Sequence, residues 1–163
     1  VIDSRNLTNL TEADIIKMTN KDLTTHYTQE PNCVGCHSFI NPTGFAFEVF
    51  DSLGRLRTQE QVYDYSGKHV ASFPINTTAV VPWGSRSIAV TDANDLASQV
   101  STSSAGQACF AKNVYEFLQS RDIASQDGCH LNETALPLQS GGSILDAFIS
   151  AAVNRGTSWK RSE

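Results

Sequence analysis

Two cysteines and a histidine stand close together in the segment Cys33-Val34-Gly35-Cys36-His37. The C-x-x-C-H pattern is the attachment signature of a c-type haem. The two thiols would add across the haem vinyl groups and bind the porphyrin covalently, and His37 would reach the iron as its proximal axial ligand. We therefore expect Cys33 and Cys36 to attach one haem c and His37 to ligate its iron.

Three other kinds of site share part of this pattern. A redox C-x-x-C normally lies at the start of a helix in a βαβ unit, and no such alternation surrounds residue 33. A zinc site needs a second pair of ligands, whereas Cys109 and Cys129 are twenty residues apart and form no second C-x-x-C. A disulfide across two intervening residues would be strained. The motif therefore favours haem attachment.

The composition indicates a globular chain. It has 163 residues, of which 40% are hydrophobic and 18% are charged, so a packed core is expected. The net charge of −5 leaves no basic stripe to neutralise phosphates, which argues against a nucleic-acid partner. No apolar run approaches the length of a membrane span. A mildly acidic surface would suit basic redox partners or simply solubility.

The cysteines also bear on the compartment. Haem c is assembled outside the cytoplasm, and the chain opens without the charged and apolar regions of a signal peptide. We therefore expect a processed chain that resides in the periplasm, at the cell surface or outside the cell. In such an oxidising compartment the two remaining cysteines, Cys109 and Cys129, are expected to form a disulfide. Two free buried thiols are the alternative.

The elements on both sides of the motif must position it. After an extended arm over residues 1–10, Thr11 is predicted to cap a helix that ends at about His26. Pro31 interrupts the helical pattern just before the motif. The tetrapeptide at residues 41–44, Asn-Pro-Thr-Gly, is a strong turn signal, and residues 45–50 are interpreted as a short apolar helix.

The rest of the chain is predicted to be mainly α. Alternating side chains on both sides of Gly67 predict two short strands, over residues 61–65 and 69–73. Residues 77–87 are interpreted as a loop. Apolar spacing then predicts helices over residues 92–100, 105–119 and 143–153, with a weaker one over 125–136.

The residues after the motif extend its pattern well beyond a bare haem signature. An Asn-Pro-x-Gly-Phe turn is followed by an acidic residue, a Phe-Asp pair and Gly-x-x-Arg. The residues concerned are Asn41, Pro42, Gly44, Phe45, Glu48, Phe50, Asp51, Gly54 and Arg57. This run resembles the cytochrome-c-like domain found near the C-terminus of large planctomycete-type and proteobacterial cytochrome proteins of unknown function. Residues 64–67 are similar to a hairpin of the same family.

The C-terminal part is similar to the small helical domain that usually follows in this family. Cys109 opens a helix, Cys129 matches the second cysteine, and Trp159-Lys160-Arg161 look like the end of that domain. The resemblance covers residues from about 20 to 161. It implies a cytochrome-c-like haem domain with a short β-hairpin over residues 1–90, followed by a small disulfide-stapled helical bundle over 91–163. The helical domains that precede this region in the family are absent from the sequence, so their functions are not carried over.

Residues near the motif are candidates for tuning the haem. The Nδ1–H group of His37 needs an acceptor, for which the carbonyl of Pro42 or a neighbour in the turn is expected. Phe39 and Phe45 would wall the haem and lower the local dielectric. The expected haem-binding set is therefore Cys33, Cys36, His37, Phe39, Pro42 and Phe45. Arg55 and Arg57 are interpreted as surface charges, with the haem propionates as alternative partners.

The ligand on the other face of the iron decides the chemistry. His26 matches a histidine often seen before the motif in the family and is the first choice, with Met18 or His69 as alternatives. A six-coordinate haem gives an electron carrier, whereas an open position gives a peroxidase-like enzyme or a sensor. A haem-stapled structural module is the third possibility. We expect a monohaem c-type cytochrome that transfers single electrons to redox partner proteins, with a homo-oligomer or filament as one form of assembly.

Overall fold

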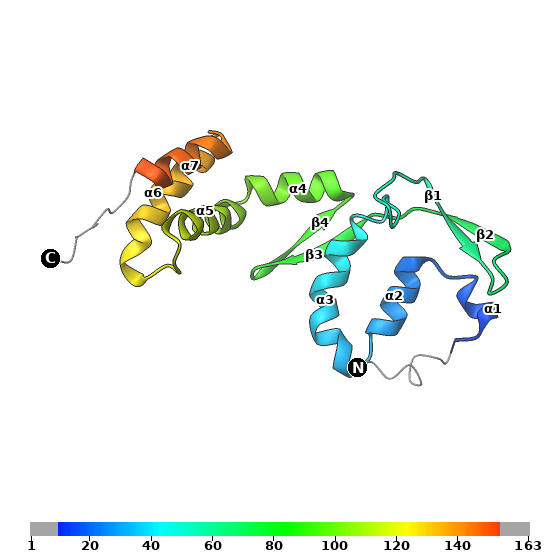
Figure 1. The fold of residues 1–163 in the computed structure, drawn as a ribbon. Helices are drawn as coiled ribbons and strands as arrows, with labels where there is room; N and C mark the ends of the chain where they lie inside the picture. Colours follow the sequence, from blue (N-terminus) through cyan, green and yellow to red (C-terminus); the bar gives the residue numbers. More distant parts are fainter. Residues whose placement is uncertain (1–9, 154–163) are drawn as a thin grey trace. The chain divides into compact units, whose positions relative to one another are not determined.

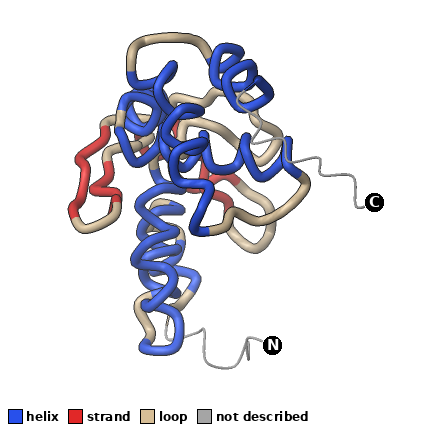
Figure 2. The backbone as a smooth tube through the Cα atoms, turned by 90° about the vertical axis from the view of Figure 1, so that its left-hand side faces the viewer, coloured by secondary structure: helices blue, strands red, loops and turns tan. Residues whose placement is uncertain are grey.

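The computed structural model describes residues 10–153, which belong to two compact units, Val1–Leu96 and Ala97–Glu163 (Figure 1). The arm expected at the N-terminus, except for its last residue, and the expected C-terminal Trp159-Lys160-Arg161 lie outside the described residues. None of the helices described is long and apolar enough to cross a membrane. Across the described residues most of the regular secondary structure is helical, and the strands form two small hairpins (Figure 2), which confirms the predicted mainly α class.

The first unit begins with two short helices, α1 (Glu12–Ile15) and α2 (Asn20–Thr28). The single helix predicted from Thr11 to His26 is therefore wrong. Thr19 interrupts it by capping α2, because its backbone N–H donates to Asp22 Oδ2 (3.1 Å) and its hydroxyl accepts from the Asp22 N–H (3.1 Å). This second Thr-x-x-Asp capping pattern is a local signal in the sequence that the periodicity of the apolar residues concealed.

The motif lies in α3 (Pro31–Phe45), which continues through the predicted turn. Pro31 occupies the first turn, where its missing N–H costs nothing. Pro42 lies inside the helix, so the turn predicted at residues 41–44 is wrong, and the chain turns after Phe45 instead of continuing as a helix to residue 50. Phe45 and Ala46 are buried at this end of the helix. Their burial stabilises a helix that local signals alone would end earlier.

The first hairpin consists of β1 (Gln59–Tyr63) and β2 (His69–Pro74), which pair antiparallel and confirm the two predicted strands, although the first lies two residues earlier than expected. Asp64 organises the turn between them. Its Oδ1 accepts from the backbone N–H groups of Ser66 and Lys68, each at 2.9 Å. These hydrogen bonds make the turn a local feature of the sequence, which is why it was predictable.

A second hairpin, β3 (Ala79–Trp83) and β4 (Arg86–Val90), replaces the loop predicted over residues 77–87. Gly84, at φ +61°, forms the turn between the two strands instead of ending the regular structure. Pro82 is tolerated because each strand of a two-stranded sheet has a free edge. β3 packs against α3, so the second hairpin supports the helix that carries the motif.

The second unit is a small helical bundle, entered through α4 (Ala93–Thr102), which spans the boundary between the units. Its helices are α5 (Ser104–Gln119), α6 (Gly128–Gln139) and α7 (Ile144–Val153), with a short 3-10 turn at Ser125–Asp127. Pairs α5–α6 and α6–α7 pack together around small buried side chains, including Ala111, Ala135, Ala147 and Ala151. The predicted helices are thus present.

Candidate functional site

The three side chains of the motif share one face of α3. Successive residues of an α-helix are rotated by roughly 100°, so positions 33, 36 and 37, at i, i+3 and i+4, lie close together on its surface. Cys36 is exposed, whereas Cys33 and His37 are half-buried, and both sulfurs are free thiols. A group attached to both thiols would therefore lie beside the imidazole of His37.

Apolar side chains of the same helix are open to solvent around the motif. Val34 and Ile40, three residues before and three residues after His37, are 44% and 58% exposed. Large apolar groups exposed together on one helix indicate a surface that another apolar group covers. The residues present thus fit a porphyrin, which needs thiols, an imidazole and apolar surface at one place.

The imidazole of His37 is held by a side chain one helical turn further on. Its Nδ1 lies 2.8 Å from Oδ1 of Asn41. The expected acceptor was the carbonyl of Pro42 or of a neighbour in residues 41–44, and the partner is instead the side-chain oxygen of Asn41. The reason is that the chain stays helical through residue 41, which brings an i+4 side chain onto the ring.

The amide of Asn41 has a second partner on the neighbouring helix. Its Nδ2 donates to the hydroxyl of Thr28 on α2 (2.7 Å), and that hydroxyl donates to the carbonyl of Thr24 (2.6 Å). Neither Asn41 nor Thr28 was predicted in this role. The i, i+4 spacing of His37 and Asn41 was visible in the sequence, but it has meaning only if the helix continues.

A concavity of about 210 Å³ lies between α2 and α3 at this point and is lined by His37. It brings together three of the predicted site residues, His37, Pro42 and Phe45. The other lining residues are Thr25, Thr28, Gln29, Val34, Ser38 and Asn41. Phe39, by contrast, points to solvent on a different face of the helix.

The predicted distal ligands lie elsewhere in the first unit and do not line the His37 concavity. Nδ1 of His26, on α2, is 3.4 Å from Nε2 of Gln29, and its ring meets Tyr27 edge-on at 5.5 Å. Met18 lies in the turn before α2. His69 stands on β2, with Nε2 3.0 Å from the hydroxyl of Ser72. The identity of the distal ligand stays a prediction.

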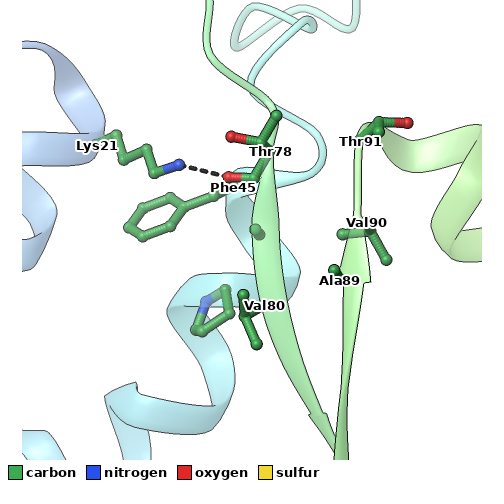
Figure 3. A pocket seen from close by; sticks show the side chains of 9 residues that line it. Lys21, Phe45, Thr78, Val80, Ala89, Val90 and Thr91 are labelled. Atoms are coloured by element: carbon green, nitrogen blue, oxygen red, sulfur yellow. Dashed lines mark hydrogen bonds between the residues drawn. The ribbon is translucent and has the colours of Figure 1, made fainter.

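A larger concavity, of about 530 Å³, lies between α2, α3 and the second hairpin (Figure 3). Lys21 reaches into it, donates from Nζ to the carbonyl of Thr78 (2.6 Å) and lies 5.1 Å from the ring centroid of Phe45. Val80 and Val90 line the hairpin side. Neither concavity is lined by Cys33 or Cys36, but the imidazole of His37 lines the smaller one and no imidazole lines the larger.

The charged residues that follow α3 pair with one another. Arg57 donates from Nη2 to Oε2 of Glu48 (2.9 Å) and from Nε to its carbonyl (3.1 Å), while Asn20 donates to Oε1 (2.9 Å). Asp51 and Arg55 form a second pair at 2.7 Å, and the backbone and side-chain hydrogen bonds from Arg55 hold the pKa of Asp51 below its usual range. Arg57, which is 26% exposed, therefore holds the chain turn after α3 from within, whereas the pair of Arg55, which is 73% exposed, lies at the surface.

The two remaining cysteines lie on packed helices of the second unit. Cys109 is on α5 and Cys129 on α6, and both are exposed free thiols in this structure. The predicted disulfide is thus not present here, and the pairing stays a prediction. Between residues 10 and 153, no group of three or more His, Cys, Asp or Glu side chains is arranged to hold a metal ion.

A family model described as a protein of unknown function, DUF1588 (PSCyt3), matches residues 3–60. That family is a planctomycete-type cytochrome-like domain of unknown function. The match includes the C-x-x-C-H motif and the run that ends at Arg57, so it confirms the resemblance for this part of the chain. No curated protein and no solved structure matches the sequence.

Proposed function

We propose that Cys33, Cys36 and His37 hold one covalently attached haem c, and that the protein carries single electrons between redox partner proteins outside the cytoplasm. The observation that carries this proposal is the common helical face of the two thiols and the imidazole. The cytochrome-like family match over the same segment supports it. When bound, the haem supplies reversible one-electron chemistry at its iron.

The residues of the chain have separate tasks in this proposal. The thiols of Cys33 and Cys36 fix the group in place, so it is not lost between electron transfers. Val34 and Ile40 exclude water next to it, which lowers the local dielectric. Oδ1 of Asn41, 2.8 Å from Nδ1 of His37, holds the ring in place, and Nε2 would ligate the iron.

Haem attachment is tested by producing the full chain in a periplasm that contains a haem c maturation system. We expect the intact mass to rise by one haem and the haem to resist extraction by acid and solvent. The double variant Cys33→Ala/Cys36→Ala loses the covalently bound haem, whereas the matched control Cys109→Ala/Cys129→Ala keeps it. A wild-type chain that stays free of haem beside a maturing control cytochrome contradicts the proposal.

The same preparation separates an electron carrier from a haem enzyme. A carrier exchanges electrons with a redox protein such as a second cytochrome c, and its reduced form binds carbon monoxide slowly or not at all. Immediate carbon monoxide binding together with turnover of peroxide would instead support the peroxidase-like alternative.

A further inference from the structure

An iron-ligating histidine is controlled through the ring nitrogen that does not touch the metal. If Nε2 binds the iron, Nδ1 carries the proton, and the acceptor of that proton sets the ring orientation and its basicity. In this chain the acceptor of His37 is Oδ1 of Asn41, at 2.8 Å.

The hydrogen bonds of Thr28 determine which way the Asn41 amide faces. A threonine hydroxyl has one proton to donate, and Thr28 donates it to the carbonyl of Thr24 at 2.6 Å. Toward Asn41 the hydroxyl can therefore only accept, so the amide presents its NH₂ group to Thr28 (2.7 Å). The amide oxygen is left to face the ring, and Nδ1 of His37 must be the donor.

The three side chains are half-buried and come from two helices, α2 and α3, that pack together. Competition from water for these hydrogen bonds is therefore reduced. The packing of the two helices, rather than the motif helix alone, selects the tautomer of the ring.

We propose that Asn41 is the positioning residue of His37, and that Thr28 fixes Asn41 so that the imidazole is held as the Nδ1–H tautomer with Nε2 free. The effect of this tautomer on the iron rests on the proposed function, whereas the tautomer can be tested without haem. Because the acceptor is a neutral amide, the ring stays a neutral ligand. A carboxylate at position 41 makes it more basic and favours ferric iron.

The tautomer is measured without haem in the full chain carrying Cys33→Ala/Cys36→Ala. Nitrogen NMR of the imidazole, at a pH where the ring is neutral, is expected to show His37 with its proton on Nδ1. Asn41→Leu shifts the proton toward Nε2. Thr28→Val, which keeps the side-chain volume and does not touch the ring, gives a shift in the same direction. The matched control Thr43→Val removes an exposed hydroxyl that bonds only within α3 and leaves the tautomer unchanged.

The reduction potential of the haem is measured on the haem-loaded chain. Asn41→Asp is expected to lower the reduction potential more than Asn32→Asp, which adds the same charge to the same helix on its first turn. The inference is overturned if Asn41→Asp and Asn32→Asp shift the reduction potential equally. It is also overturned if the His37 tautomer is the same in Asn41→Leu and Thr28→Val as in the parent chain. If Asn41→Leu fails to fold, judged by circular dichroism, Thr28→Val decides. Failure of the wild-type chain to take up haem contradicts the proposed function, while the tautomer measurement still decides this inference.

Discussion

Arg121 and Asp127 are joined by two parallel hydrogen bonds, Nη1 to Oδ2 at 2.7 Å and Nη2 to Oδ1 at 2.9 Å. The same carboxylate accepts from the backbone N–H of Ala124 (2.7 Å) and from the hydroxyl of Tyr115 (3.2 Å). The side chain of Asp127 is only 4% exposed. One buried carboxylate thus ties α5 to the start of α6, in the bidentate geometry that makes arginine–carboxylate pairs strong.

Asp127→Asn is expected to destabilise the second unit. The amide keeps the shape of the side chain but removes its charge and leaves a guanidinium N–H group unpaired. We expect the Tm to fall by ~5 °C or more. Thermal unfolding followed by circular dichroism measures this. Asp122→Asn, a change of the same kind at an exposed neighbour, leaves the Tm nearly unchanged.

The same carboxylate gives the stability a definite pH dependence. The side-chain hydrogen bonds from Arg121 and the backbone N–H of Ala124 hold the pKa of Asp127 well below its usual value of 3.8. A group whose pKa is lowered by folding contributes stability above its unfolded pKa and loses it as the pH falls toward the folded one. The difference in unfolding free energy between wild type and Asp127→Asn should therefore be constant near neutrality and shrink below about pH 4. Urea unfolding at a series of pH values tests this, and a difference that grows on acidification contradicts it.

The two arginines after α3 are expected to differ in their contribution to stability. Arg57 is 26% exposed and its partner Glu48 is 13% exposed, so Arg57→Ala leaves a largely buried carboxylate without its charged donor. A loss of about 1.5–3 kcal/mol is expected for hydrogen bonds of this kind. Arg55, 73% exposed, is the matched control, and its replacement by Ala should have little effect. Urea unfolding of the first unit distinguishes them, and equal losses in both variants would be the contrary result.

The predicted disulfide can be tested on oxidised protein. If Cys109 and Cys129 pair, the Cys33→Ala/Cys36→Ala chain should contain no titratable thiol after purification from a periplasm. Breaking the bond with Cys109→Ser should then lower the free energy of unfolding by about 3 kcal/mol, because it closes a loop of intermediate length. A reductant should produce the same loss in the parent chain and none in the variant. Two free thiols in the oxidised parent would show the prediction to be wrong.

The distal ligand is identified by single replacements in the haem-loaded chain. We expect His26→Ala to convert a low-spin ferric spectrum to a high-spin one and to open the iron to carbon monoxide. Met18→Leu and His69→Ala serve as matched controls and should keep the low-spin spectrum. If one of these controls loses it while His26→Ala does not, that residue is the ligand.

Local patterns determined much of this protein from the sequence. The positions 33, 36 and 37 share a face on any α-helix, because that follows from spacing alone. The first hairpin was predictable because Asp64 and Gly67 make its turn within a few residues. The helices of the second unit were predictable because their apolar residues recur at helical intervals.

Tertiary structure decided the features that depend on distant partners. Pro42 and Gly84 act locally as breaks, yet burial of Phe45 keeps Pro42 inside a helix, and strand pairing turns Gly84 into the tip of a hairpin. The hydrogen-bond acceptor of His37 also differs from the predicted one, because Asn41 reaches the ring only if the helix continues through residue 41. Thr28, which orients that amide, is thirteen residues away and meets it only where α2 packs on α3. The sequence alone therefore determined the atoms available for attachment, and packing decided how the imidazole among them is held.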